Sequence, residues 1–486
     1  MKNLIDFGIL NLSSIAPMMV LSLFAVFILV LNFINKNISR TFWTMLAILG
    51  LAINIFFLFG YSGIVRGFFD LVLIDGFAFI SMIIILLFSI LFLPLTLSKE
   101  NFHDCSLAEF YALYLFMIVG YEFMVSSQNL IVILVGLETS SLALYALIAL
   151  HNRTRAIEAA IKYFTMGALS TGFFCFAIVI FYLSSASLDI SAISYSAKNT
   201  DPILIATACI FLICSIGFKL SLIPFHTWIP DVYEGSSEVV AGYISIVPKI
   251  AGFIVAMRVF ESLYDSNIAF IQISLYIIAV LTMTLANIMA LIQNDVKRML
   301  AFSSISHAGF VLCAVVIGTK SANIGLFLYW LMFSFANLGA FSVLWFTRNK
   351  QNIWHERFDH PFEKFNGLVK FLPYTSFLMA LFMISLAGIP PFSVFWGKMY
   401  LMGSAISSGF IFMAVIMAIN SAIAVYYYLR IIVCMFLKEP LENAEATLYK
   451  QNSSNAIKFI ITFSAILCIL APFMVKFWTD FVLKFI

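Results

Sequence analysis

Apolar stretches separated by short polar breaks follow one another along the whole chain. Many reach the roughly 18 to 20 residues that a helix needs to cross a hydrocarbon core about 30 Å thick. Splitting the chain at its polar and Gly- or Pro-containing breaks therefore predicts an all-α integral membrane protein of about fourteen transmembrane helices. The predicted helices cover residues 12–34, 41–61, 69–97, 106–125, 127–150, 155–183, 202–225, 236–262, 268–293, 298–317, 322–346, 373–401, 405–437 and 456–483.

The first apolar stretch, from Ser14 to Ile34, is predicted to be a retained helix rather than a signal peptide. It is longer than a signal-peptide core, and no small-residue cleavage site precedes the polar stretch that follows it. We therefore count it as helix 1.

The basic residues of the loops predict the orientation, because Lys and Arg near helix ends are retained on the cytoplasmic side of a membrane. Most of them lie in loops 1–2, 3–4, 5–6, 9–10, 11–12 and 13–14, whereas the alternate loops hold Arg66, Lys198 and Lys320. Both termini are therefore predicted on the outer, periplasmic face of a bacterial inner membrane, with a mitochondrial inner membrane as the alternative. The long polar loop from Arg348 to Lys370 then lies on the cytoplasmic or matrix side.

Two of the predicted helices, 7 and 12, are interrupted by proline. The interruptions read IPFHTW at 223–228 and GIPPFSVFW at 388–396. Proline removes a backbone donor, and in lipid the freed carbonyls need partners, so such breaks persist where they line a protein-enclosed wet cavity. Because the two breaks are five helices apart, they indicate two inverted five-helix repeats, helices 4–8 and 9–13.

This repeat predicts the division of the chain into four parts. The N-terminal helices 1–3 occupy residues 1–104, and the first antiporter-like repeat occupies residues 105–265. The second repeat occupies residues 266–437, and a loop with helix 14 completes the chain at residues 438–486.

Composition agrees with a membrane protein and excludes several functions. The 486-residue chain is 63% hydrophobic and only 10% charged, and its net charge of +3 is too small to indicate a nucleic-acid partner. No GxGxxG or P-loop motif stands at a strand-to-helix turn. The seven cysteines lie apart without CxxC spacing, so neither a redox centre nor a metal site is expected: Cys105, Cys175, Cys209, Cys214, Cys313, Cys434 and Cys468.

The candidate chemistry lies in ionisable residues inside the apolar stretches. A lysine at the centre of a bilayer costs roughly 2.5–3.5 kcal/mol or more, so each one needs a partner or water within the bundle. A lysine whose distance from a carboxylate changes can accept and then release a proton. The candidates for such a proton relay are Glu138, Lys162, Lys219, Lys249 and Lys398.

Other ionisable residues support weaker expectations. His307 lies in the polar patch SSISHA at 303–308 and could relay protons, although a lone histidine within a helix is more often a packing residue. The alternative for the buried lysines is a static pair or a side chain that reaches the interface, and Lys162 is near its helix start. Charges closer to helix ends are expected to contact solvent or headgroups: Asp75, Glu109, Glu122 and Arg430.

Several motifs resemble the antiporter-like membrane subunits of respiratory complex I. The first is LETSSLALYAL at 137–147, followed by KYF at 162–164. The more specific ones, FHTWIPDVYEG at 225–235 and PKIAGF at 248–253, are similar to the subunit N branch of that family, which includes mitochondrial subunit 2. DVKRMLAFSSISH at 295–307 and GIPP at 388–391 complete a resemblance that covers about residues 105–435.

The resemblance implies a proton-translocating membrane subunit of NADH:quinone oxidoreductase, a translocase. Glu138 and Lys219 would form a coupled pair, Lys249 the central relay, and Lys398 the outlet. NADH, FMN, iron–sulfur clusters and quinone would be bound by partner subunits, and this chain would carry no cofactor. One departure is Glu238 within SSEVV at 236–240, where the family more often has small residues and proline; it is expected to perturb the turn between helices 7 and 8.

Three other functions remain open at this point. Subunits of multi-protein sodium/proton antiporters and membrane-bound hydrogenases share the fold and have lysines in like positions, although the DVYEG form at 231–235 favours subunit N. A non-transporting scaffold would use the buried charges only to hold neighbouring membrane subunits. A stand-alone carrier for a small solute would need a cluster of polar residues at mid-membrane, and the sequence shows none.

Overall fold

The computed structural model describes residues 10–61, 63–99, 107–264, 269–349, 358–441, 446–449 and 452–485. In chain order its first elements are η1 (Leu12–Ile15), α2 (Ala16–Ile34), α3 (Arg40–Phe59), β1 (Val65–Gly67), β2 (Val72–Ile74), α4 (Gly76–Phe92), η2 (Leu93–Thr96), α6 (Ala108–Val125), α7 (Leu130–Ala149), α8 (Thr154–Ser185), α9 (Ile190–Ala197), α10 (Pro202–Leu220), α11 (Trp228–Gly235) and α12 (Glu238–Ile244). The remainder are α13 (Val247–Leu263), α14 (Ala269–Leu291), α15 (Val296–Ile317), α16 (Lys320–Phe346), η4 (Phe362–Phe365), α17 (Leu368–Phe371), α18 (Pro373–Ala387), α19 (Ser393–Ser407), α20 (Ile411–Leu437), α21 (Ala446–Tyr449) and α22 (Asn455–Phe485).

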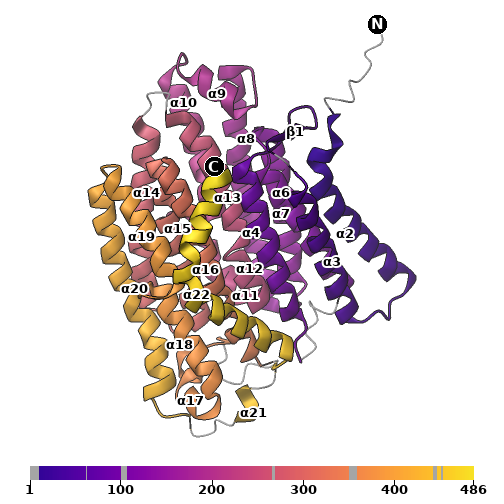
Figure 1. Ribbon diagram of the computed structural model, residues 1–486, viewed down its shortest axis with the longest axis vertical. Helices are drawn as coiled ribbons and strands as arrows, with labels where there is room; N and C mark the ends of the chain where they lie inside the picture. Colours follow the sequence, from indigo (N-terminus) through magenta and orange to yellow (C-terminus); the bar gives the residue numbers. More distant parts are fainter. Residues whose placement is uncertain are drawn as a thin grey trace.

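Helices running roughly side by side make up the molecule (Figure 1). Within the described ranges, thirteen segments are long and apolar enough to cross a membrane. The broken pair α18 and α19, each 15 residues long, supplies the fourteenth crossing predicted from hydropathy. The prediction of an all-α membrane protein with about fourteen helices is therefore confirmed.

Most predicted boundaries agree with the structure to within a few residues. The clearest differences are the start of helix 3 and the break between helices 12 and 13, which lies six residues later than expected. Helix 3 was expected from residue 69, but α4 begins at Gly76, where the Asp75 carboxylate caps it by accepting the Ala78 amide at 2.9 Å. The preceding residues form a short antiparallel hairpin, with Val65 opposite Ile74. A count of apolar residues cannot distinguish such a hairpin from the first turns of a helix.

The core is formed by helices that are buried all round. The most apolar stretches of α12–α13, α15 and α16 are 100% buried, whereas those of α2 and α8 are only 33% and 28% buried. A helix that is apolar on every side is stable at the centre of a bundle, and helices with exposed apolar faces suit lipid or neighbouring subunits. The residues carried by α13 and α15 are therefore the most deeply enclosed in the chain.

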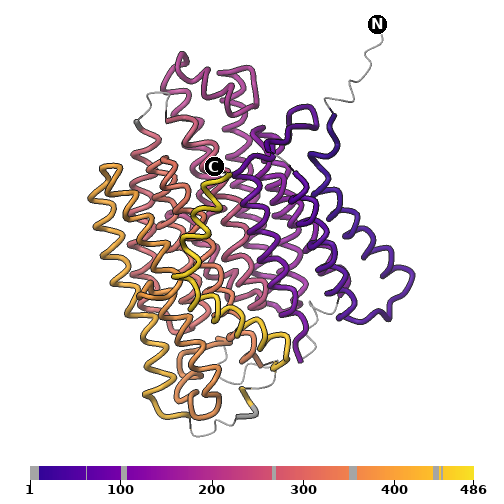
Figure 2. The backbone as a smooth tube through the Cα atoms, viewed as in Figure 1, coloured from indigo at the N-terminus to yellow at the C-terminus, as the bar shows by residue number. Residues whose placement is uncertain are grey.

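The two ends of the bundle differ in the segments that they carry. Figure 2 shows that the described chain starts and finishes toward the same, upper end. The hairpin β1–β2 and α9 also lie at this end, while α17 and α21 lie at the lower end (Figure 1). Termini at one end agree with an even number of crossings.

The two predicted helix breaks are present and end their helices in the same way. α10 ends before Ser221, whose φ is +60°, and α18 ends before Gly388, whose φ is +82°. In both, the next amide donates to a carbonyl five residues earlier, at 2.8 Å after Ser221 and 3.3 Å after Gly388. This is the Schellman arrangement, which closes a helix end and satisfies orphan carbonyls. Division into two inverted repeats stays a prediction.

Close packing of α6 on α7 depends on two glycines. A Cβ atom at Gly120 would lie 2.6 Å from the Gly136 carbonyl oxygen, and a Cβ atom at Gly136 would lie 2.6 Å from the Gly120 carbonyl oxygen. Small residues let helix backbones approach in this way inside membranes. The contact matters because α7 also carries Glu138.

We expect Gly136→Ala to destabilise the protein by about 1–3 kcal/mol, because the two backbones must move apart. The matched control is Gly172→Ala on α8, where a Cβ atom would meet nothing within 4 Å. Thermal unfolding of the detergent-purified protein measures both. Equal melting temperatures for the two variants would contradict the packing described.

Candidate functional site

Glu138 and Lys219 lie at the meeting of α7, α8 and α10. The Glu138 carboxylate is half-buried and accepts a hydrogen bond from the Thr171 hydroxyl at 2.5 Å. The Lys219 ammonium, in the last turn of α10, donates to the Ser141 hydroxyl. Lys219 therefore stands beside the first helix break, where the carbonyl end of α10 favours a positive charge.

The predicted coupled pair is close but not in direct contact. Both side chains are described, and no ion pair within 4.0 Å joins Glu138 to Lys219. Ser141, which receives the lysine, follows Glu138 by three positions on α7, so the two groups share one face of that helix. A small change in the Lys219 side chain would move its charge between a hydroxyl and a carboxylate.

Aromatic rings hold the Lys219 end of α10 in place. The Lys219 ammonium lies 6.0 Å from the centroid of the Tyr163 ring. That ring stacks on Trp228 at 4.2 Å with an interplanar angle of 8°, and the Trp228 indole donates to the Phe218 carbonyl at 3.0 Å. The indole adds a second hydrogen bond to this carbonyl, which also accepts the Ser221 amide at 3.0 Å.

Lys249 is enclosed at the centre of the bundle. Its side chain is only 1% exposed, and its ammonium donates to the Ser304 carbonyl at 2.6 Å and to the Ser304 hydroxyl at 2.9 Å. The Tyr233 hydroxyl lies 3.1 Å from the same Ser304 hydroxyl. No carboxylate pairs with Lys249 among the described residues, so its partners are neutral hydroxyl and carbonyl groups.

His307 continues this polar path one helical turn further along α15. Its Nδ1 lies 2.6 Å from the Tyr329 hydroxyl, and its Nε2 lies 3.1 Å from the Tyr428 hydroxyl. The Tyr428 hydroxyl also bonds to Ser303. Both ring nitrogens thus have hydroxyl partners, which is the arrangement that a proton relay needs.

Lys398 faces the second helix break. Its ammonium is buried, donates to the Ala387 carbonyl at 2.8 Å, and lies 5.1 Å from the centroid of the Phe310 ring. Ala387 is the last residue of α18, so Lys398 binds a carbonyl that the helix itself leaves unpaired. Lys219 and Lys398 therefore both lie beside a helix end exposed by a break.

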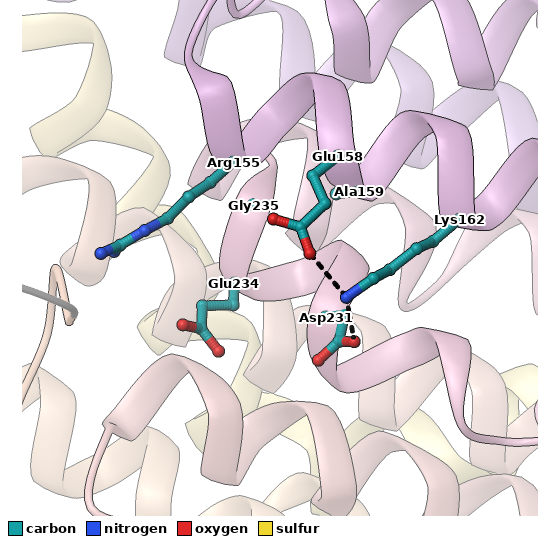
Figure 3. A pocket seen from close by; sticks show the side chains of 7 residues that line it. All are labelled: Arg155, Glu158, Ala159, Lys162, Asp231, Glu234 and Gly235. Carbon is teal, nitrogen blue, oxygen red and sulfur yellow. Dashed lines mark hydrogen bonds and ion pairs between the residues drawn. The ribbon is translucent and has the colours of Figure 1, made fainter.

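Lys162 lies at the surface of this chain rather than inside the bundle. Its side chain is 46% exposed and pairs with Glu158 at 2.8 Å and with Asp231 at 3.0 Å. Lys162 lines a charged pocket of about 260 Å³. Figure 3 shows its ammonium between the carboxylates of Glu158 and Asp231. Arg298 pairs with Asp231 at 3.3 Å and with Glu234 at 2.6 Å.

The sequence reading missed a second group of buried charges, centred on Glu238. This carboxylate is 0% exposed and pairs with Arg348, with Lys297 at 3.3 Å and with His360 Nε2 at 3.0 Å. The turn before it is an ordinary helix start, in which Ser237 caps α12. The expected perturbation is thus absent, and Glu238 instead joins α12, α15 and the loop after α16. The signal was present in its departure from the family motif.

Three titratable groups in or beside this cluster lie outside the membrane-spanning helices, and their pKa values are shifted. Burial lowers the pKa of Lys364 to about 7, although Glu238 and Asp359 oppose the shift. Burial also lowers the pKa of His360 to about 3, so its imidazole is neutral at pH 7. Burial raises the pKa of Asp295 to about 6, against hydrogen bonds from two backbone amides.

Of the charges expected near solvent, Glu122 is buried and Asp75 is half-buried. Glu122 is 0% exposed, and Asn54 of α3 donates to it at 2.7 Å. Asp75 takes two hydrogen bonds from Arg258, at 2.5 and 2.9 Å. Hydropathy placed both residues near helix ends, but it cannot show which neighbouring helix covers them. In the described part of the chain, no three His, Cys, Asp or Glu side chains form a metal site, and Cys105 lies outside that part.

Comparison with known proteins gives the family of this chain. The family described as NADH:quinone oxidoreductase/Mrp antiporter, TM, matches residues 127–424. A NADH-quinone oxidoreductase subunit N of Campylobacter hominis is 99% identical over 486 residues, which is 100% of both chains. The chain belongs to the NADH-quinone oxidoreductase subunit N family. Another subunit N, from Campylobacter concisus, is 54% identical over 461 residues, covering 94% of this chain and 93% of the relative. The resemblance found in the motifs is confirmed.

Solved structures agree with the subunit N fold. A chain of respiratory complex I from Thermus thermophilus with bound aureothin is 28% identical, with a TM-score of 0.77 over 95% of this chain and 98% of that one. A chain of an archaeal membrane-bound sulfane sulfur reductase has a TM-score of 0.85 at 22% identity, over 97% of this chain and 96% of that one, and shares the fold.

The Lys398 geometry gives a test at Gly388. A Cβ atom there would lie 2.9 Å from the Lys398 ammonium nitrogen, and the positive φ adds strain of about 1 kcal/mol or more. Gly409 has nearly the same φ, +85°, with nothing within 4 Å of a Cβ atom. We expect Gly388→Ala to unfold at a lower temperature than Gly409→Ala, because only the former displaces Lys398. Equal melting temperatures for the two variants would contradict the contact between Lys398 and Gly388.

Proposed function

We propose that this chain moves protons across the membrane as a subunit of an NADH:quinone oxidoreductase, driven by electron transfer in partner subunits. The observation that carries the proposal is two buried hydrogen-bonded groups one helical turn apart on α15, Lys249 with Ser304 and His307 with Tyr329 and Tyr428. The hydrogen bonds within each group measure 2.6–3.1 Å, and the apolar stretches of α12–α13, α15 and α16 are wholly buried. A static scaffold would be better served by apolar packing, since burying charge is costly.

Glu138 and Lys219 form the proton-loading end of this path. When Lys219 contacts Ser141 its charge is shared with a neutral hydroxyl, and when it turns to Glu138 the ion pair favours the protonated amine. A signal from a neighbouring subunit that changes this distance would make Lys219 release or take up a proton. Thr171 keeps the carboxylate oriented in both states.

Lys249 then serves as the central relay and Lys398 as the outlet. His307 joins them, because it accepts or donates at both ring nitrogens within the same polar path. Lys398, on the Ala387 carbonyl, stands where the second break opens the bundle. Lys162, at the surface, is assigned to communication with a neighbouring chain rather than to conduction.

The chain is proposed to work among cofactor-binding partner subunits in a bacterial inner membrane. NADH, FMN, iron–sulfur clusters and quinone are bound by partner subunits, and the complex as a whole is the translocase. The membrane is the bacterial inner membrane, with both termini outside, because loop Lys and Arg residues gather on the opposite face. The two helix breaks support two inverted repeats, helices 4–8 and 9–13.

Lys249→Met tests the central relay in inner-membrane vesicles that contain the assembled complex. Met nearly preserves the side-chain volume but cannot carry a proton, so NADH-driven proton uptake should fall while assembly is retained. The control is Lys198→Met, at an exposed lysine in the loop after α9. The readout is protons taken up per NADH oxidised.

The outcome separates the competing functions. Normal proton uptake per assembled Lys249→Met complex would favour the non-transporting scaffold. Uptake that depends on sodium and continues without NADH would favour the sodium/proton antiporter.

A further inference from the structure

The Glu238 cluster forms an unbroken row of titratable groups at the end of the bundle that carries the loop after α16. Lys364 donates to His360 Nδ1 at 3.1 Å, and His360 Nε2 lies 3.0 Å from Glu238. Glu238 in turn accepts a hydrogen bond from the Lys297 ammonium at 3.3 Å. All four side chains are at most 2% exposed. Asp359, next to this row, reaches the surface, with 16% of its side chain exposed.

The partners of His360 fix its tautomer. A lysine ammonium can only donate, so His360 Nδ1 accepts from Lys364 and the ring proton is on Nε2, aimed at Glu238. A proton passed from Lys364 to Nδ1 therefore releases the Nε2 proton to Glu238. The step leaves Lys364 neutral, His360 neutral in the other tautomer, and Glu238 protonated, so atoms and charge balance.

Glu238 uses a single oxygen for its partners. Its Oε1 takes the bonds from Arg348, Lys297 and His360, whereas its buried Oε2 has no hydrogen-bond partner among the described residues. Oε1 is therefore the oxygen that receives the proton from His360 Nε2. Glu122 Oε2 is likewise buried without a described partner, so the row of titratable groups, and not the unpaired oxygen, distinguishes Glu238.

The end of α11 connects this row to the central relay. Lys297 donates to the Ser236 carbonyl at 2.6 Å, while the Tyr233 hydroxyl meets Ser304, the partner of Lys249. Lys297 and Ser304 are seven positions apart on α15, about 10 Å along its axis. Tyr233 and Ser236, three positions apart at the end of α11, thus contact α15 at both of these positions.

We propose that Lys364, His360, Glu238 and Lys297 form a proton-uptake relay that supplies Lys249 from the surface near Asp359. This inference rests on the proposed function and adds a site to it. The lowered pKa of Lys364, about 7, agrees with a group that loads and unloads near neutral pH. As the pH rises above that value the loaded fraction falls, so uptake should decline. The other charged groups that face Lys364 and His360 are Asp295, Arg348 and Asp359.

Two variants distinguish a proton relay from a purely structural ion cluster, here called a clamp. His360→Gln can still accept from Lys364 and donate to Glu238, but it cannot transfer a proton. Lys364→Arg keeps the positive charge but does not lose its proton near neutral pH. Both are measured in inner-membrane vesicles of the assembled complex as protons taken up per NADH oxidised. The control is Lys370→Gln, at an exposed lysine that pairs with Glu439.

We expect both variants to assemble and to lose as many protons per NADH as Lys249→Met, and Lys370→Gln to match the parent. Uptake equal to the parent in either assembled variant overturns the relay. If neither assembles, Glu238→Gln decides by the same ratio, and failure of all three to assemble assigns the cluster to a clamp. Normal uptake in Lys249→Met would instead contradict the proposed function itself.

Discussion

A lysine ammonium inside hydrocarbon must find a polar partner, and this constraint shapes the centre of the molecule. Lys249 donates hydrogen bonds to the hydroxyl and carbonyl of Ser304, and Lys398 donates one to the carbonyl of Ala387. Neither amine is neutralised by a carboxylate among the described residues. Such partners hold a charge in place without fixing its protonation, which is the condition that a relay needs and a structural ion pair does not.

The second helix break provides the partner of Lys398, whereas the partner of Lys249 lies within the continuous helix α15. A carbonyl at a helix end can bind a buried lysine because the helix itself leaves it unpaired. The breaks after α10 and α18 end each helix with a left-handed residue and leave carbonyls near Lys219 and Lys398. The burial of α15 and α16 then keeps lipid away from the path between the breaks.

Hydropathy predicted the helices well, because the length and apolar content of a segment are enough to identify a membrane-spanning helix. Glu138, Lys219, Lys249 and Lys398 were found for the same reason: a charge in an apolar stretch is visible in the sequence. Their partners were not, since Ser304 or Tyr428 resembles any other polar residue until the helices are packed. Glu122 in the interior was placed incorrectly, because hydropathy does not tell which helix covers a residue. Lys162 is exposed at the surface of this chain, and its role stays a prediction. Glu238 was visible only as a departure from a motif.

The central claim is that proton movement depends on carboxylates beside the lysine path and not on buried charge in general. Two membrane carboxylates allow a direct comparison: Glu138, on the face of α7 that receives Lys219, and Glu122, bound to Asn54 away from the buried lysines. The measurement is NADH-driven proton uptake by assembled complexes carrying Glu138→Gln or Glu122→Gln. We expect uptake to be lost in Glu138→Gln and kept in Glu122→Gln. Equal uptake in both, whether normal or reduced, would contradict the account.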